Sequence, residues 1–405
     1  MKNFELLAPA GNLSKLKTAF YFGADAVYLG GKNFSLRSFS DNFTQDELLS
    51  AVKFAHDFGK KVYVTVNIYA RNADFSYLED YLKYLDLIGV DAVIVSDPGI
   101  IALAKKVAPH VDVHISTQAN TLNKYSAKFW VDFGASRIIL ARELSLLDIK
   151  EIRDFLPDNI ELEAFCHGAM CISYSGRCLL SDYFSNRSSN RGECVQACRW
   201  NYSIREKNSN GEYYDISEDE KGTYILNSKD LNMVSYLDKM YDAGISSLKI
   251  EGRMKSEYYV ATVINAYRRA IDEFEKVGAK YKENPLFMQE ILNTNHRAFT
   301  TAYMLNDNHE TVNYADSQSV GDRTFTASVL GYDSEKKLAL IEMRNRFFVG
   351  DKLEVLSPSQ SFNKVITVTD LTDEQGNAVT DAKIVQQKLY LKTDIPLHEG
   401  DILRK

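Results

Sequence analysis

Hydrophobic and polar positions repeat as one unit along residues 4–276 of the chain. Hydrophobic residues three or four apart predict an amphipathic helix that ends near a glycine, and a run rich in β-branched residues then predicts a buried strand. The predicted strands lie within 4–11, 22–31, 58–68, 88–97, 111–120, 133–143, 160–168 and 243–253. The predicted helices lie near 14–22, 45–58, 76–88, 99–107, 123–133, 145–155, 229–243 and 256–276. Eight alternating units predict an α/β fold of the (β/α)8, TIM-like barrel type.

A doubly wound open sheet is the alternative, because it also alternates strands with helices. No glycine-rich dinucleotide fingerprint follows a strand in this sequence, which favours the barrel. Barrel enzymes carry their chemistry at the C-terminal ends of the strands. The polar residues at those predicted ends are Asn67, Asp97, Gln118, Arg142, Glu143, His167, Glu251 and Arg253. Asp97 stands before Pro98 and is also the expected N-cap of the next helix.

An insertion, residues 166–226, interrupts the seventh unit and is much longer than an ordinary loop. Its first part contains all five cysteines of the chain. Its second part, 202–216, alternates around Asn210 and Gly211 and predicts a β-hairpin. Because the insertion follows the end of a strand, we expect it to lie over the mouth of the barrel.

The hydrophobic pattern changes after the eighth unit. Residues 281–320 are polar and irregular, and the segment 321–405 contains short alternating strands separated by Gly-Asp turns. We therefore expect three parts: a barrel over 1–280, a linker over 281–320, and a small β-barrel domain over 321–405.

Four of the cysteines are spaced C-x6-C-x15-C-x3-C, at Cys171, Cys178, Cys194 and Cys198. Four thiolates suit either tetrahedral zinc or an iron–sulfur cluster. The absence of tight C-x2-C pairs favours a cluster, most simply 4Fe-4S, while zinc and unligated thiols remain open. Cys166 directly precedes His167, on the opposite face of the predicted strand, and we expect it to be a small buried residue.

Charge and hydropathy bear on the location and partners of the protein. The net charge of −7 gives no overall basic character, so a nucleic-acid partner would need a local basic face. The sequence has no run of 18 apolar residues and no signal-peptide pattern at its start. We therefore expect a cytoplasmic protein without a membrane span, in a compartment where clustered cysteines indicate a metal or redox site.

The segment "EAFCHGAMCISYSGRCLLS", residues 163–181, closely resembles the signature of the collagenase-like peptidase family, number thirty-two among the peptidases of unknown type. Further segments that resemble the family are 190–202, 247–272 and 295–304, together with "ELLAPAG" and "GADAVYLGG" near the start. The resemblance covers essentially the whole chain. It implies a barrel with an inserted cluster segment and a C-terminal β-barrel.

Despite its peptidase label, this family implies hydroxylation chemistry. Its characterised bacterial members are implicated in forming 5-hydroxyuridine at the wobble position of tRNA, in hydroxylating a ribosomal-RNA cytidine, and in hydroxylating quinone rings without oxygen. Prephenate is the metabolite linked to these reactions. The resemblance places the cluster ligands on Cys171, Cys178, Cys194 and Cys198, and the C-terminal module favours the tRNA branch. It implies tRNA and a small carboxylate as partners, and leaves open a second family member as hetero-partner.

The residue types at the barrel mouth suggest roles in such a reaction. We expect catalytic roles for His167, which can exchange a proton near neutral pH, for Glu251, and for Arg253, which can hold a carboxylate through two hydrogen bonds. The expected substrate-binding residues are Asn67, Gln118, Arg142, Arg177, Arg199 and Trp200. We also expect Lys249 and Glu251 to face the barrel lumen with Glu163, whose strand face should include Phe165 and His167.

Two other functions remain open on the sequence. A peptidase would need a catalytic apparatus, yet no H-E-x-x-H or G-x-S-x-G pattern occurs, and Cys166 and His167 should point to opposite faces. A non-catalytic binding module with an inert cluster would not need ionisable residues at several strand ends. These observations favour an enzyme.

Overall fold

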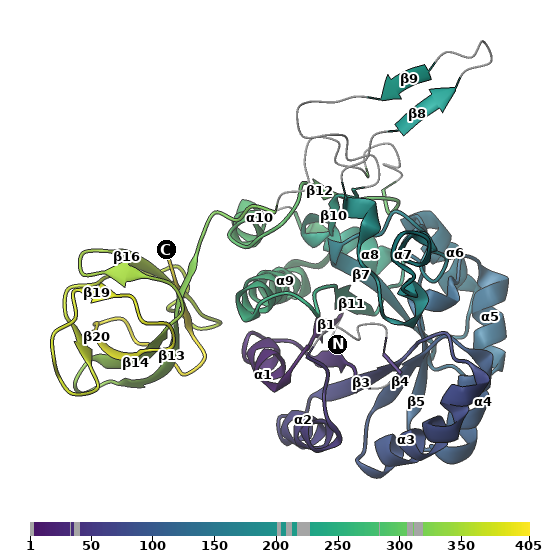
Figure 1. Cartoon of the computed structure of the whole chain (residues 1–405), viewed down its shortest axis with the longest axis horizontal. Helices are drawn as coiled ribbons and strands as arrows, with labels where there is room; N and C mark the ends of the chain where they lie inside the picture. The colour runs from purple at the N-terminus through teal and green to yellow at the C-terminus, as the bar shows by residue number, and fades with distance from the viewer. Residues whose placement is uncertain are drawn as a thin grey trace.

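Eight parallel strands form a closed barrel in the computed structural model, which describes residues 4–32, 34–35, 41–200, 227–282, 284–305, 311 and 319–405, together with the backbone of 204–207 and 213–216. The barrel strands are β1 Glu5–Pro9, β2 Ala26–Leu29, β3 Lys61–Val66, β4 Ala92–Val95, β5 Asp112–Ile115, β6 Arg137–Ile139, β7 Glu161–Ala169 and β11 Ser247–Ile250. The ring closes because β11 pairs with both β7 and β1 (Figure 1). The predicted TIM-like barrel is therefore confirmed.

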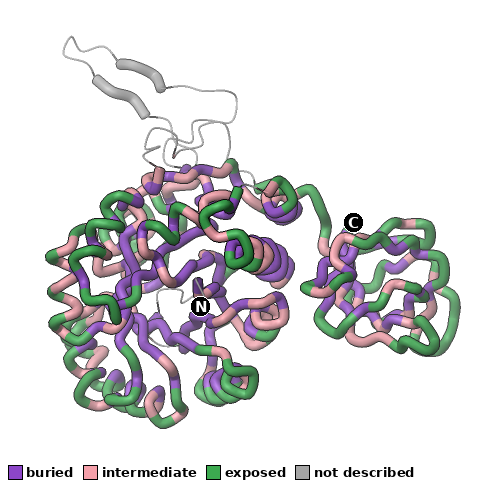
Figure 2. Tube along the Cα trace, turned by 180° about the vertical axis from the view of Figure 1, so that it is seen from behind, coloured by how far each residue is buried: buried purple, intermediate pink, exposed green. Residues whose placement is uncertain are grey.

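Helices surround the strands and bury one face against them, as the repeated amphipathic pattern requires. They are α1 Leu13–Tyr21, α2 Gln45–Asp57, α3 Phe75–Leu87, α4 Pro98–Val107, α5 Lys124–Asp132, α6 Leu146–Phe155, α8 Leu237–Asp242 and α9 Glu257–Val277. Figure 2 shows the buried residues along the strands and the inward helix faces. Asp97 caps α4 by accepting hydrogen bonds from the backbone N–H of Gly99 and Ile100, as expected.

The predicted helix over 229–243 is too long. Only α8, 237–242, and a preceding 3-10 turn η5 at Val234–Tyr236 are helical, while Asp230–Asn232 form strand β10. The reason is the length of β7, which extends beyond the barrel to Ala169. β10 pairs antiparallel with this extension and so satisfies its backbone groups.

The segment 281–320, expected to be an irregular linker, has ordered structure in its described part. Helix α10, Pro285–Leu292, buries Phe287 and Ile291, and strand β12, Phe299–Thr300, pairs parallel with β10. These contacts attach the segment to the barrel.

The insertion contains helix α7, Leu180–Ser185, and two 3-10 turns, η3 Ser189–Arg191 and η4 Ala197–Arg199. The predicted hairpin is present as the antiparallel strands β8 Ile204–Lys207 and β9 Tyr213–Ile216, while its expected turn at Asn210 and Gly211 lies outside the described residues. Figure 1 shows the hairpin projecting away from the barrel, on the side where β10 and β12 lie.

The C-terminal domain is an antiparallel sheet that curls around its own core (Figure 1). Its strands are β13 Phe325–Asp333, β14 Leu338–Met343, β16 Lys352–Leu356, β17 Val365–Thr367, β18 Leu371–Asp373, β20 Lys388–Lys392 and β21 Ile402–Arg404, with a separate pair β15 Phe347–Phe348 and β19 Asp381–Ala382. The fully buried Arg404 joins this domain to α10 through two 2.7 Å bonds to Glu290. In the part of the chain described above, no helix has the length and apolar character needed to cross a membrane.

Candidate active site at the barrel mouth

A cavity of about 450 Å³ lies between the cysteine segment and the C-terminal ends of the barrel strands. The four cysteines of the spaced set all line it: Cys171, Cys178, Cys194 and Cys198. On the barrel side, its walls include Gln118, Arg142 and Glu251. We call this space the cysteine cavity. The tertiary structure thus brings the thiols and the strand-end polar residues to one place.

A second, smaller cavity of about 70 Å³ lies deeper, in the barrel lumen. Gln118, Arg142 and Glu251 line both cavities, and Asn67 and Arg253 line the deeper one. Five of the residues expected at the site therefore converge, although they come from different strand ends. Such convergence at the C-terminal face is what barrel enzymes use to surround a substrate.

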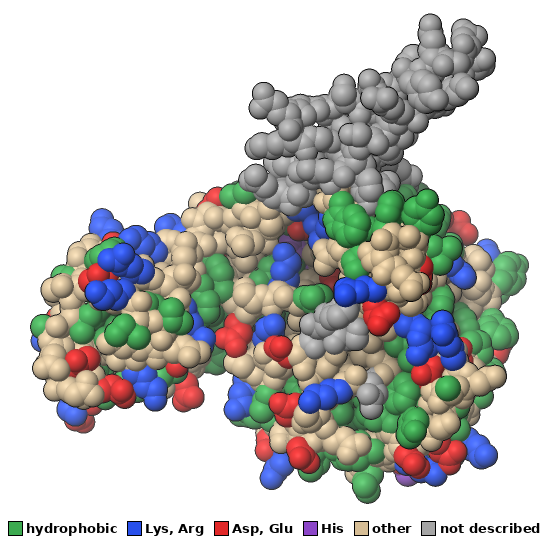
Figure 3. Space-filling view, viewed as in Figure 1, with side chains coloured by type: hydrophobic (Ala, Val, Ile, Leu, Met, Phe, Trp, Pro, Cys, Tyr) green, Lys and Arg blue, Asp and Glu red, His purple; other side chains and the backbone are tan. Residues whose placement is uncertain are grey.

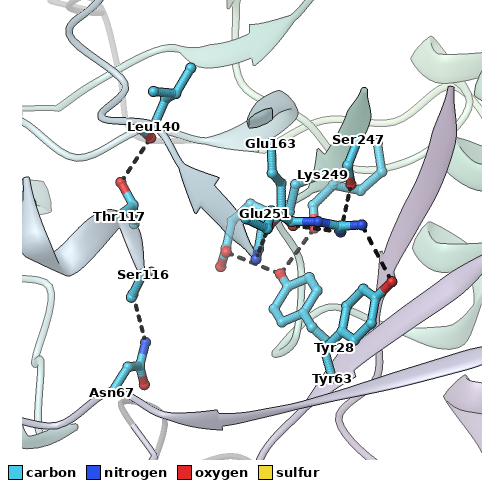
Figure 4. A network of polar contacts seen from close by, with 12 residues as sticks. Tyr28, Tyr63, Asn67, Ser116, Thr117, Leu140, Glu163, Ser247, Lys249 and Glu251 are labelled. Carbon is cyan, nitrogen blue, oxygen red and sulfur yellow. Dashed lines mark hydrogen bonds and ion pairs between the residues drawn. The ribbon is translucent and has the colours of Figure 1, made fainter. Parts of the chain in front are cut away.

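A buried ionic network forms the floor of this lumen (Figure 4). Glu163 is fully buried, accepting a hydrogen bond from Lys249 Nζ at 2.6 Å and another from Arg137 Nη1 at 3.1 Å. The Tyr28 hydroxyl donates to Glu251 Oε2 at 3.3 Å. The prediction that Glu163, Lys249 and Glu251 face the lumen is confirmed, and the ion pairs of Glu163 with Lys249 and Arg137 compensate the cost of burying their charges.

Arg253 is 4% exposed and is held by neutral polar groups. Its Nη1 donates to Ser35 Oγ at 2.8 Å and to Thr65 Oγ1 at 3.3 Å, and its Nη2 donates to Asn42 Oδ1. A guanidinium that is fixed in place at the wall of the deeper cavity suits recognition of an anion there.

Arg142 lies between the two cavities. Its Nη1 donates to the carbonyl of Ala169 at 2.9 Å, and its guanidinium carbon lies 4.8 Å from the centroid of the Phe165 ring. These contacts fix the plane of the guanidinium and occupy few of its five N–H groups. The remaining donors are available at the boundary of the cavities.

His167 does not share the lumenal face of Glu163 and Phe165, and that part of the expectation is wrong. The pairing of β7 with β11 shifts register between Lys249 and Ile250, so β7 carries one extra residue there, as in a β-bulge. The His167 ring is buried against Tyr259 and Tyr267 of α9, with centroids 6.1 and 5.5 Å away. Burial lowers the pKa of His167 to about 4. The ring lines neither cavity, and its Nδ1 has no hydrogen-bond partner.

The remaining expected substrate residues divide between the cavity and the surface. Arg199 lines the cysteine cavity. Trp200 is 42% exposed on the outside of the cysteine segment, with its ring 6.0 Å from that of Phe184. Arg177 is exposed and lines neither cavity. The arginine next to Cys178 is therefore a surface residue here.

Residues outside the expected catalytic and substrate-binding set also lie near the site. Lys255 lines the cysteine cavity, and burial lowers its pKa. Asp230 of β10 pairs with Arg297 at 2.5 Å, and both are buried beside this face. Lys255 lies two residues after Arg253 in the sequence, and this short spacing from a predicted strand end indicates a position near the barrel mouth. Asp230 and Arg297 are 67 residues apart, and only the pairing of β10 with β7 and β12 brings them to the site.

The four thiols can be compared with the needs of a metal group. Within the described ranges, no three or more His, Cys, Asp or Glu side chains are arranged as ligands of a metal ion. The thiols are nevertheless close enough to influence one another. Burial raises the pKa of Cys198 to about 11, and the charges of Cys171, Cys194 and Cys178 also raise it. Four thiol donors around one cavity are the donor set of an iron–sulfur cluster or a zinc ion.

Cys166 differs from the other four cysteines. It is fully buried, and its thiol donates to the carbonyl of Lys249 at 3.5 Å. Burial raises the pKa of this thiol, so it stays protonated. Its expected role as a small buried residue outside the ligand set agrees with this position.

Comparison with known proteins gives matches along nearly the whole chain. Residues 11–314 match the model of "Peptidase family U32" and residues 322–404 that of "Peptidase family U32 C-terminal domain". The chain is 40% identical over 405 residues to a "tRNA hydroxylation protein P1" of Bacillus subtilis, covering 100% of this chain and 95% of that protein. A "tRNA hydroxylation protein P" of Escherichia coli is 37% identical, with 93% and 90% covered. A "Collagenase" of Porphyromonas gingivalis is 31% identical, with 89% and 88% covered.

Proposed function

The chain belongs to peptidase family U32, and on this basis we propose that it is an RNA-modifying enzyme that hydroxylates tRNA, forming 5-hydroxyuridine at the wobble position. Full-length similarity to proteins named for tRNA hydroxylation supports the substrate. The observation that carries the proposal is the convergence of four thiols, Arg142 and Glu251 on one cavity at the barrel mouth. A thiol-rich, partly enclosed cavity suits redox chemistry on a base drawn out of its stack.

We assign the 4Fe-4S cluster to Cys171, Cys178, Cys194 and Cys198, since these are the thiols that line the cavity. When bound there, such a cluster would supply redox or Lewis-acid chemistry. The protein contributes the positions of the other groups. Arg142 and Arg253 would bind the carboxylates of a small dianion such as prephenate, whose geometry suits a guanidinium fork.

The polar residues of the deeper cavity would orient the reacting base. Asn67 and Gln118 present amide groups, which can both donate and accept hydrogen bonds. Glu251, held by Tyr28, stands at the boundary of the two cavities and can exchange a proton there. His167 acts, in this proposal, by fixing β7 beneath the cysteine segment, because its ring packs on α9.

The test is nucleoside mass spectrometry on tRNA from a strain without this gene, complemented by variants. We expect the 5-hydroxyuridine-derived nucleosides to disappear, to return with the parent protein, and not to return with Cys171→Ser or Cys194→Ser. Cys166→Ala is the matched control, because it removes a thiol outside the cavity, and it should restore the modification. Unchanged nucleosides in the deletion strain would contradict the function.

The same variants test the cluster separately. Protein prepared without air should be brown, contain about four irons and absorb near ~400 nm. Serine at any of the four cavity cysteines should abolish the colour. Stoichiometric zinc without iron in such a preparation would overturn the cluster assignment.

Peptidase activity is the second candidate, and the geometry gives it little support. The buried Cys166 thiol is kept protonated, while burial holds His167 neutral. His167 Nδ1 lacks the acceptor that orients the base of a catalytic dyad. Hydrolysis of collagen peptides by the purified protein, abolished by Cys166→Ala, would favour it.

A further inference from the structure

Three aromatic side chains gather on the outside of the cysteine segment. Tyr183 and Phe184 lie on α7 and Trp200 follows η4, with exposed fractions of 83%, 45% and 42%. The ring centroid of Phe184 lies 5.0 Å from that of Tyr183 and 6.0 Å from that of Trp200. We call these residues the aromatic cluster. A group of exposed aromatic rings on a protein surface commonly marks an interaction site.

The aromatic cluster lies at the rim of the cysteine cavity. α7 contributes Leu180 and Ser181 to the wall of this cavity, and η4 contributes Cys198 and Arg199. Each residue of the aromatic cluster is thus only one to three positions along the sequence from a residue that lines the cysteine cavity. Figure 3 shows hydrophobic side chains gathered on this part of the surface, with Lys and Arg side chains nearby.

Cations lie immediately inside the rim. Arg199 precedes Trp200 in the chain and lines the cavity, as do Lys255 and Arg142. Lys255 Nζ donates to the carbonyl of Asn295 at 3.4 Å, and it lies 5.1 Å from the centroid of the Tyr259 ring. An unpaired nucleotide has a flat base that can stack and a negatively charged phosphate. The aromatic rings outside the cavity suit the base, and the cations at its wall suit the phosphate. The centre of a protein–protein interface is usually depleted in charged residues, so the cations beside the aromatic cluster favour RNA over a protein partner.

We propose that the aromatic cluster stacks the unpaired bases that flank the reacting base, while Arg199 and Lys255 hold the phosphates of the same strand. This inference rests on the proposed function and deepens it, since it names the surface that binds the unpaired nucleotides beside the reacting base. The bases of a duplex cover each other's faces and cannot stack on Tyr183 or Trp200. The aromatic cluster thus selects unpaired RNA before the reacting base enters the cysteine cavity.

Trp200 offers a direct reporter of stacking. The chain has two tryptophans, Trp130 on α5 and Trp200, so Trp130→Phe leaves a single tryptophan at the proposed contact. Titration of the full-length, metal-loaded protein with a single-stranded RNA oligonucleotide should quench its fluorescence. The same sequence annealed as a duplex should leave the fluorescence unchanged.

Binding measured over a range of salt concentrations separates stacking from phosphate contacts. Tyr183→Ala and Trp200→Ala should each weaken binding of the single strand by about 5- to 150-fold, with the parent salt slope. Arg199→Ala and Lys255→Ala should each reduce the salt slope by about 0.7, the value for one phosphate of a single strand. Trp200→Phe should recover most of the affinity. Tyr125→Ala, which removes a 70% exposed aromatic ring from α5, is the matched control and should bind as the parent does.

The inference would be overturned if Tyr183→Ala and Trp200→Ala both bound the single strand with the parent affinity. The same conclusion would hold if light scattering showed that these variants change self-association of the protein while RNA binding is unchanged. Equal quenching of Trp200 by duplex and single strand would also overturn it. The outcome is independent of the hydroxylation test. If tRNA nucleosides are unchanged in the deletion strain yet Trp200 is quenched, the proposed reaction fails while the RNA contact stands. If hydroxylation is confirmed and Trp200 is not quenched, only the contact fails.

Discussion

Removing the charge of Glu163 tests whether the lumenal network stabilises the barrel beneath the site. Glu163 is fully buried, and its partner Lys249 has a side chain only 6% exposed. At the observed 2.6 Å, and with an effective dielectric constant of about 20, their attraction is about 6 kcal/mol, part of which offsets desolvation. In Glu163→Gln, Lys249 loses this partner, while Arg137 keeps Glu5 and Glu161 at 2.6 Å each.

We therefore expect Glu163→Gln to lower the free energy of unfolding by about 3–5 kcal/mol, the usual cost of leaving one buried charge without its partner. With a urea m-value of about 3 kcal/mol/M, the unfolding midpoint should fall by about 1–2 M. The double variant Glu163→Gln/Lys249→Met removes both charges and should recover most of this loss.

Glu161→Gln is the matched control. It changes the same kind of group on the same strand and removes bonds to the same arginine, but the Glu161 side chain is 49% exposed. Its loss should be about 1 kcal/mol or less, because solvent screens an exposed pair. A loss below about 1 kcal/mol in Glu163→Gln, or a double variant as unstable as the sum of its single variants, would refute the reasoning.

Three further predictions concern the histidine, the buried arginine and the domain contact. The folded-state pKa of His167, about 4, lies below the usual value of about 6.5. The free energy of unfolding should therefore be constant above pH 6.5 and fall by about 3 kcal/mol as the pH is lowered to 4. Urea midpoints measured at several pH values should show this dependence, and His167→Gln should remove most of it. Arg253→Lys should preserve the iron content but raise the prephenate concentration needed for hydroxylation, since an ammonium cannot replace the fork; unchanged prephenate dependence would exclude Arg253 from binding it. Glu290→Gln leaves Arg404 with a weakened buried partner and should speed hydrogen exchange in β21 while leaving α5 unchanged.

Periodicity and turn chemistry in the sequence were sufficient for the eight βα units, because each unit buries its own hydrophobic face against its neighbours. The capping role of Asp97 and the buried state of Cys166 were equally local, set by Pro98 and by the position of Cys166 on its strand. The spacing of the four cysteines predicted a common site, and the wall of the cysteine cavity contains all four.

Features that depend on contacts between distant segments were decided only in the tertiary structure. The extra residue in β7 turned His167 away from the lumen, and a strand bulge leaves no trace in an alternating pattern. The extension of β7 needed a partner for its backbone groups, so 230–232 became a strand rather than the start of a helix. Asp230 pairs with Arg297 because β10 lies between β7 and β12, and Phe184 contacts Trp200 because the insertion folds back on itself. The sequence by itself determined which residues could carry the chemistry, since residue type and local periodicity are local properties. The tertiary structure decided which of them share a cavity, because that depends on the register and closure of the barrel.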